Sequence, residues 1–386
     1  MSRWLRRFAW SWLVLIPATL VFLAATEPGL RFLISVGNRL SGGLFTIGSA
    51  SGTLWGPLHL GDLRYADGID TVLIDTVDIS WDPSQLLNRQ IRIQTIHAVG
   101  IRVILGESPG ETLLAPFALP GRLVIETILA EQTTVLSNQE EIWHVEKGTL
   151  TNLRYQGPIL EIDSLVLNSG QSTIRAQGQL LTENEYPLRY TVETQAQPAG
   201  YQPIVAHGTL TGPLNGLKLE ATLESPLAAQ LRGRIDKLLG ETTWEARVES
   251  PVIALPAIHR DWPNQGFSQM VIDGRGSLEE YVLNIRSSTE LPGAKEPTAL
   301  AAEIHGDFNG FLVPSLHLTH GKASLAAQGR LTWTPTLSWQ ASVDGAHLDP
   351  SLVIAEWPGD LACRLTTEGE IQEEGIYNRA ILLSCE

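Results

Sequence analysis

Apolar and polar residues alternate along most of the chain, from about residue 45 almost to the C-terminus. In one clear segment, Leu217, Leu219 and Leu223 alternate with the charged residues Lys218 and Glu220. Alternation with a period of two predicts a β-strand that has one apolar and one polar face. The same alternation recurs in four further segments, which cover residues 91–105, 188–193, 244–249 and 337–344.

Turn-forming dipeptides separate the predicted strands. Gly-Pro, Asn-Gly and Asp-Gly pairs recur, as at residues 215–216 and 344–345, and these pairs favour tight turns. A weak Ala-x-Gly-x-Leu repeat starts at Ala176, Ala206 and Ala327. No segment after the first 40 residues keeps a helical period. We therefore predict a mainly β chain of about 25 strands in a long antiparallel meander.

The N-terminus carries a different pattern, an uninterrupted apolar run. Residues 8–26 hold no charged residue, and Arg3, Arg6 and Arg7 precede them. A helix of 19 residues spans about 28 Å, close to the hydrocarbon thickness of a bilayer. Arginines before a span place the N-terminus in the cytoplasm. We predict a transmembrane anchor, with a cleaved signal peptide as the alternative. Both interpretations export the rest of the chain.

These patterns predict four regions along the chain. Residues 1–7 form a cytoplasmic tail, 8–26 the anchor, 27–45 a short amphipathic helix and linker, and 46–386 a periplasmic sheet region. Within the third region, apolar residues recur with helical spacing over Pro28–Leu40.

The charge balance and the absence of motifs narrow the classes of function. The chain has 27 Lys and Arg against 42 Asp and Glu, a net charge of −15, which argues against nucleic acid as a partner. No nucleophile elbow, phosphate-binding loop, dinucleotide fingerprint or zinc-protease motif occurs. We predict no enzyme, no catalytic residue, no metal site and no cofactor.

The remaining polar residues that could form a functional site are better explained by ordinary structural roles. His317 and His320 are three apart in a predicted strand and so point to opposite faces, which is poor geometry for a metal. His97 falls on the apolar parity of its strand, where we expect a hydrogen-bonded or edge histidine. Three nearby aspartates resemble a carboxylate cluster but are expected on a solvated face, and they are Asp75, Asp78 and Asp82.

The only two cysteines, Cys363 and Cys385, are separated by 21 residues, about one hairpin. In an oxidising periplasm they could form a disulfide. The sequence leaves open whether they are bridged.

Several motifs occur in a characteristic order. A glycine-rich segment at 48–58 follows the N-terminal run and leads to LGDLRY at 60–65 and VDISWDP at 77–83. Near the other end, LDP at 348–350 precedes WPGDL at 357–361. In this order the motifs resemble the TamB family, the large inner-membrane subunits of the translocation and assembly module, within the AsmA-like superfamily.

The resemblance implies an elongated, curved sheet with a hydrophobic inner groove (a β-taco), anchored in the inner membrane of a Gram-negative cell. It also implies a role in outer-membrane biogenesis: autotransporter and outer-membrane protein assembly, protein secretion and phospholipid transport. The implied partners are the membrane, phospholipid and a TamA-like outer-membrane barrel. Longer members meet that barrel through a C-terminal region, which we expect this chain to lack.

Two other functions stay open. One is an accessory subunit of a type II-like secretion system. The other is an exported, β-rich, carbohydrate-active enzyme, which needs clustered carboxylates and aromatic residues around a polar cleft.

The apolar residues that alternate along the strands are candidates for the lining of a lipid groove. Such a lining would stabilise an acyl chain by about 0.8 kcal/mol for each CH₂ kept out of water. An ordinary sandwich core is the alternative for the same residues. The candidates are Ile91, Ile93, Ile101, Val103, Leu188, Val192, Leu217, Leu219, Leu223, Trp339 and Val343.

Overall fold

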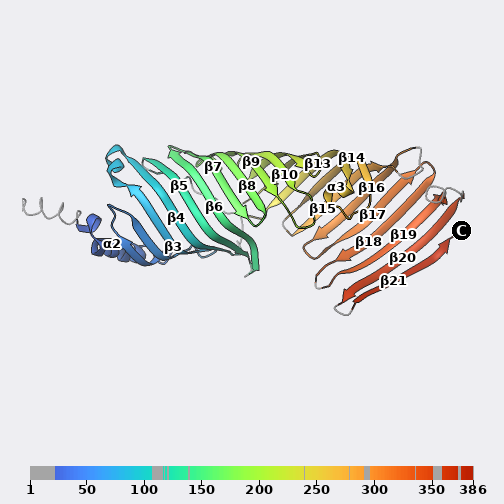
Figure 1. Cartoon of the computed structure of the whole chain (residues 1–386), viewed down its shortest axis with the longest axis horizontal. Coiled ribbons are helices and arrows are strands. Elements are labelled where there is room, and N and C mark those ends of the chain that lie inside the picture. Colours follow the sequence, from blue (N-terminus) through green and yellow to red (C-terminus); the bar gives the residue numbers. More distant parts are fainter. Residues whose placement is uncertain are drawn as a thin grey trace, which may run out of the picture. The chain divides into compact units, whose positions relative to one another are not determined.

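The computed structural model is mainly β (Figure 1). It describes residues 22–106, 116, 118–119, 121–137, 140–238, 240–277, 279–290, 296–334, 336–350, 359–372 and 375–385. The chain divides into two compact units, Met1–Thr194 (unit 1) and Gln195–Glu386 (unit 2), and the boundary falls inside strand β9 (Leu188–Ala196). Over the described ranges there are 21 strands, so the predicted meander is confirmed.

Unit 1 opens with one helix and continues as a sheet. The helix is α2 (Glu27–Leu40), and a 3₁₀ helix, η1 (Pro83–Asn88), follows the third strand. The strands before β9 are β1 (Phe45–Gly52), β2 (Leu58–Ala66), β3 (Thr71–Asp82), β4 (Gln90–Leu105), β5 (Arg122–Ser137), β6 (Glu140–Gln156), β7 (Ile159–Ser169) and β8 (Ser172–Leu181).

Unit 2 is a meander with one short helical insertion, α3 (Leu255–Ile258), after its fourth strand. Its strands are β10 (Ile204–Gly212), β11 (Gly216–Ser225), β12 (Ala229–Asp236), β13 (Thr243–Ala254), β14 (Gly266–Ser277), β15 (Glu280–Thr289), β16 (Thr298–Asp307), β17 (Gly310–His320), β18 (Ala323–Thr332), β19 (Ser338–Leu348), β20 (Leu361–Gln372) and β21 (Gly375–Cys385).

Within β1 to β8, and within β10 to β21, every two consecutive strands pair. All these pairs are antiparallel except β4–β5, which is parallel. A parallel pair requires the connecting chain to cross a face of the sheet. At the end of that connection, the backbone N–H of Leu119 donates to Oη of Tyr155, which is 2% exposed.

The strands of unit 1 contain a feature that simple alternation does not predict, which we call a double step. A double step is a pair of consecutive residues that both point away from the apolar face, so that apolar residues are spaced by three instead of two. In β3, exposed Asp75 and Thr76 separate Ile74 from buried Val77.

Double steps face one another across neighbouring strands and form a line across β2 to β6. Gly100 shows why the line has sequence requirements. Its φ is +72°, and a Cβ there would lie 2.6 Å from the carboxyl carbon of Asp75. The line comprises Gly61-Asp62, Asp75-Thr76, Val99-Gly100, Glu131-Gln132 and Glu146-Lys147.

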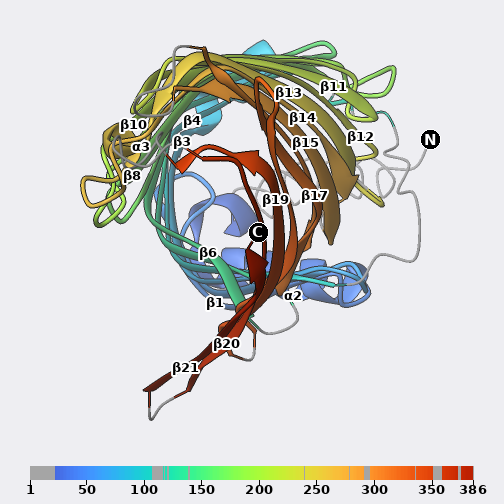
Figure 2. The ribbon, with the colours of Figure 1, turned by 90° about the vertical axis from the view of Figure 1, so that its right-hand side faces the viewer.

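A second line of double steps crosses β4 to β7, and Asn152 in it has φ +53°. Extra residues of this kind bend strands and raise their twist. The ribbons of unit 1 are accordingly curved (Figure 2). The second line comprises Gln94-Thr95, Glu126-Thr127, Thr151-Asn152 and Asp163-Ser164.

Helix α2 covers the free edge of the unit 1 sheet. The side-chain amide of Asn38 donates to the carbonyl of Ile47 (3.0 Å) and accepts from its N–H (3.1 Å), as a neighbouring strand would. Arg31 donates to the carbonyl of Ala50 (3.4 Å), and Leu30 is buried. An open strand edge invites pairing with other chains, so α2 closes this edge.

Candidate functional site

The residue pairing of unit 2 connects apolar side chains from strand to strand on one face. One row crosses β11 to β20 without a polar residue, and at about 4.8 Å per strand it is about 43 Å long. We call this side of the sheet the apolar face of unit 2. The row is Ala221, Leu231, Val248, Ile272, Ile285, Ala302, Leu316, Ala327, Val343 and Leu365.

Unit 1 has an apolar face of the same kind. It extends across both lines of double steps, and the cluster around buried Leu63, Val77 and Ala98 belongs to it. One row crosses β2 to β8, and it consists of Leu58, Ile79, Ile96, Ile128, Leu150, Leu165 and Ala176.

The opposite face of each unit is charged. In unit 2, Asp273 pairs with both Arg247 (3.0 Å) and Arg286 (2.9 Å), which links three neighbouring strands. In unit 1, Arg92 pairs with Glu126 (2.6 Å). Exposed pairs of this kind contribute little stability. These charged residues keep one face of the sheet hydrated, whereas the opposite face stays apolar.

Among the residues that the structure describes, no second layer covers most of either apolar face. Across the described ranges, only nine hydrophobic residues are buried, and only two of them, Leu217 and Ala229, lie in unit 2. A sandwich core buries the apolar faces of both its sheets. Apolar side chains such as Leu365, which is 37% exposed, instead remain accessible.

The predicted lining residues lie on strands in both units. Ile91, Ile93, Ile101 and Val103 lie on β4, and Leu188 and Val192 on β9. Leu217, Leu219 and Leu223 lie on β11, and Trp339 and Val343 on β19. Exposure ranges from 1% for Leu217 to 39% for Ile91. In unit 2, strand pairing places all five candidates on the apolar face.

Two expectations about β4 are corrected by the double steps. By simple alternation Val99 and His97 share the face of Ile101. In the structure Ala98 faces the apolar side and the alternation reverses at Gly100, so Val99 and His97 turn outward. His97 Nε2 lies 3.2 Å from a carboxylate oxygen of Glu131 on the charged face.

The other polar candidates have separate partners. Asp75 pairs with Arg102 (3.1 Å) and Asp78 with His59 (2.5 Å). Asp82 accepts from the backbone N–H of Ser84 (3.0 Å) at the start of η1. Hydrogen bonds, the largest from the Ser84 hydroxyl, hold the pKa of Asp82 below its usual value.

The histidines form no metal site in the part of the chain that the structure describes. There, no three His, Cys, Asp or Glu side chains come together to hold an ion. Nδ1 of His320 lies 3.3 Å from Oγ1 of Thr298, whereas His317 is exposed.

Cys363 is disulfide-bonded, and the β20–β21 pairing sets it opposite Cys385, the other cysteine of the chain.

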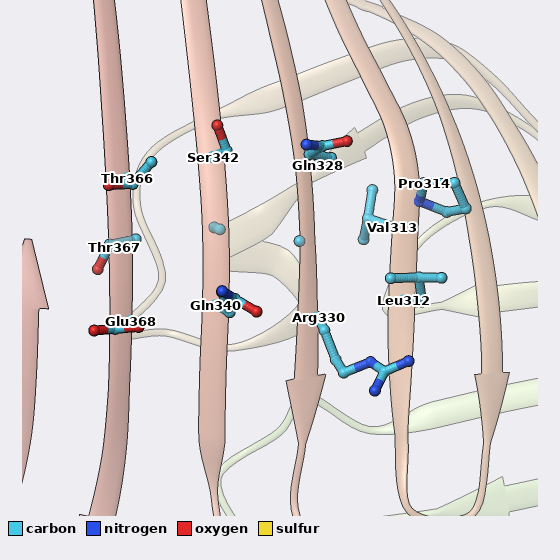
Figure 3. A pocket seen from close by; sticks show the side chains of 12 residues that line it. Leu312, Val313, Pro314, Gln328, Arg330, Gln340, Ser342, Thr366, Thr367 and Glu368 are labelled. Carbon is cyan, nitrogen blue, oxygen red and sulfur yellow. The ribbon is translucent and has the colours of Figure 1, made fainter. Parts of the chain in front are cut away.

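A hollow of about 720 Å³ lies on the charged face of unit 2 (Figure 3). The backbone at Gly329 and Ala341 forms its floor, between side chains such as Arg330, Gln340 and Glu368. Glu368 is the only carboxylate in its lining, which contains no histidine or cysteine. A pair of carboxylates of the kind used in glycoside hydrolysis is therefore not assembled there.

The membrane anchor predicted at 8–26 lies mostly outside the described residues, which begin at position 22. Among the helices that the structure does describe, none has the length and apolar character needed to span a bilayer.

A single-layer sheet with one apolar and one charged face is the architecture expected of a β-taco protein. A family model described as "TamB, N-terminal domain" matches residues 16–113 and 106–382. The chain therefore belongs to the TamB family and represents its N-terminal part. Membership supports a TamB-like role in outer-membrane assembly or lipid transport in general, in a membrane-associated periplasmic protein. No solved structure matches the chain.

Proposed function

We propose that the apolar faces of the two units carry phospholipid acyl chains through the periplasm. The observation that supports this most is the apolar row of unit 2, which continues over ten strands and which no second layer of described residues covers. Shielding fifteen methylenes from water is worth about 12 kcal/mol. A continuous apolar row offers that shielding at every strand, so a chain can advance without an aqueous gap.

The proposal includes an inner-membrane anchor over residues 8–26. Its support is the charge-free run behind three arginines, together with exposed apolar residues at the C-terminal end of that run and beyond it. Phe22 is 50% exposed, Phe32 58% and Trp55 62%, and the N–H of Trp55 donates to the carbonyl of Ala24 (3.1 Å). Aromatic residues suit a membrane interface. A mature protein that keeps Met1 or Ser2 supports the anchor, and a soluble form that begins near Thr26 contradicts it.

Photo-crosslinking tests the transport proposal. A diazirine amino acid at Leu219 or Trp339 on the apolar face should capture phospholipid. The matched positions Glu220 and Gln340, each one residue along the same strand, should not, because they face the charged side. Equal capture at both members of each pair, or capture at neither, contradicts the proposal.

Because the family acts in outer-membrane assembly, we propose outer-membrane proteins as a second cargo. A TamA-like barrel as partner is a prediction of the resemblance alone. The family match favours this role over an accessory subunit of a type II-like secretion system.

A further inference from the structure

Three aromatic side chains of unit 2 lie across glycines of the neighbouring strand on the apolar face. Tyr281 stands opposite Gly306 in the β15–β16 pairing, and Trp339 stands opposite Gly369 in the β19–β20 pairing. Built on the backbone, a Cβ at Gly306 would lie 2.6 Å from Cε2 of Tyr281. A Cβ at Gly369 would lie 2.6 Å from Cε2 of the Trp339 indole. Side-chain carbons do not approach so closely, so each ring occupies the space that a methyl group would need.

The third ring is placed differently: Trp244 pairs with Gly276, and its ring reaches diagonally over Gly274. A Cβ at Gly274 would lie 3.0 Å from Cζ3 of Trp244. The indole N–H of Trp244 donates to the carbonyl of Ser277 (2.8 Å), which fixes the ring in this orientation.

The orientation of these rings sets the free height above the sheet. A ring in contact with the backbone beneath it rises about 3.5 Å, whereas a ring that stands upright extends much further from the strand. Any side chain at the glycine would push the ring away from the backbone and into the space above the apolar face. The glycines therefore affect the apolar face by leaving room for the rings to lie against the backbone.

Sequence context agrees with this role. Gly306 lies between His305 and Asp307, and Gly369 between Glu368 and Glu370. At both places the alternation along the strand assigns the glycine to the apolar face, where an apolar side chain would be expected. A glycine inside a strand weakens the strand, so its presence requires a compensating reason, and the ring over it is such a reason.

We propose that Gly306 and Gly369 are positioning residues that hold Tyr281 and Trp339 flat, so that an acyl chain can pass over them on the apolar face of unit 2. This inference rests on the proposed transport function. Trp244 on Gly274 is a weaker instance of the same device.

Phospholipid capture near Trp339 tests the inference in the full-length protein, mixed with vesicles of phosphatidylethanolamine and phosphatidylglycerol. The diazirine amino acid is placed at Leu331, directly opposite Trp339, or at Leu219, on β11 of the same unit. Gly369→Ala should lower capture at Leu331 at least threefold and leave capture at Leu219 unchanged.

The double variant Trp339→Ala/Gly369→Ala should restore capture at Leu331, because the methyl group then has no ring to lift. Gly266→Ala is the matched control, since a Cβ at Gly266 meets only the Ile253 carbonyl oxygen at 3.7 Å. This variant should capture like the wild type.

The outcomes separate the two proposals. No capture at Leu331 or Leu219 in the wild-type protein contradicts the transport function. Normal wild-type capture that Gly369→Ala leaves unchanged overturns the positioning role alone. Loss of capture that the double variant fails to restore also overturns it, because the glycine is then needed only for the strand itself.

Discussion

The sheet of unit 1 buries six of its hydrophobic side chains among the described residues, and the sheet of unit 2 buries two. Both sheets carry continuous apolar rows, so composition does not explain the difference. Strands β4, β5 and β6 of unit 1 have 16, 16 and 17 residues and are bent at two lines of double steps. Strands β10, β11 and β12 of unit 2 have 9, 10 and 8 residues.

The comparison shows two ways to shape an apolar face. Long strands that bend repeatedly bring their own apolar residues together, which buries side chains such as Ile125. The apolar face of unit 2 buries fewer side chains, and there flat rings over Gly306 and Gly369 determine how much space remains. Unit 1 should therefore respond to changes mainly through stability, and unit 2 mainly through transport.

The largest expected difference between the units comes from placing a charge on the apolar face of each. Ile125 in unit 1 is 7% exposed, so Ile125→Arg buries an unpaired charge and should cost several kcal/mol. We expect the melting temperature to fall by on the order of 10 °C. Leu219 in unit 2 is only partly buried, so Leu219→Arg should fold but stop transport.

Thermal unfolding measures the first effect, and the sensitivity of cells to a bulky antibiotic measures the second. Lys218→Glu, on the charged face beside Leu219, is the control and should leave the barrier intact. A stable, abundant and fully functional Leu219→Arg protein would rule out a conduit and favour a scaffold.

The success of sequence-based prediction differs between strands, because it depends on whether a strand contains a double step. In β11 the alternation is unbroken, so the sequence alone places Leu217, Leu219 and Leu223 on one face. In β4 two double steps reverse the alternation and restore it. Ile93 and Ile101 thus share a face although the residues between them do not follow the same parity.

A usable signal for the double steps is present in the sequence. Apolar residues spaced by three recur in β4 to β7, and the pairs are Ile93 and Ile96, Ile125 and Ile128, Leu150 and Leu153, and Ile162 and Leu165. Such spacing suggests a helix when read alone. The parallel β4–β5 pair and the rings over glycines depend on contacts between distant residues, which periodicity does not report.

Loss of the disulfide should affect unit 2 alone. In the chain-entropy account, a bridge that closes a loop of about 20 residues contributes about 3 kcal/mol. Cys363→Ser should therefore loosen β20 and β21, seen as faster amide hydrogen exchange in these strands with β4 to β6 unchanged. Wild-type protein in reductant should behave like the variant. Two free thiols in peptide mapping of the untreated protein would contradict the bridge.

A change at a double step should destabilise unit 1. Gly100→Ala forces alanine to adopt φ near +72° and crowds the Asp75 carboxylate, at a cost of about 2 kcal/mol. Denaturant unfolding gives the change in the free energy of unfolding. Gly266→Ala in unit 2 has room for its methyl group and should stay within about 0.5 kcal/mol of wild type. Equal effects of the two substitutions would argue against a special backbone at Gly100.

The smallest expected effect is the pH dependence of stability that Asp82 contributes at the start of η1 in unit 1. Because hydrogen bonds lower the pKa of Asp82 in the folded protein, its ionised form stabilises the fold above the unfolded pKa of about 4. This contribution disappears as the pH falls through the lower, folded pKa. Asp82→Asn should therefore melt slightly below wild type at pH 7, and the difference should shrink as the pH falls below about 4. A difference that grows on acidification would have the wrong sign.

The most direct test of a continuous apolar face is a photo-crosslinking scan along β4, where double steps and simple alternation disagree. With the diazirine amino acid placed singly at Ile96, His97, Val99 or Ile101, phospholipid should be captured at Ile96 and Ile101. His97 and Val99 should stay unlabelled, although Val99 is apolar and shares the parity of Ile101. Capture at His97, Val99 and Ile101 with none at Ile96, or no capture along the strand, would contradict the account.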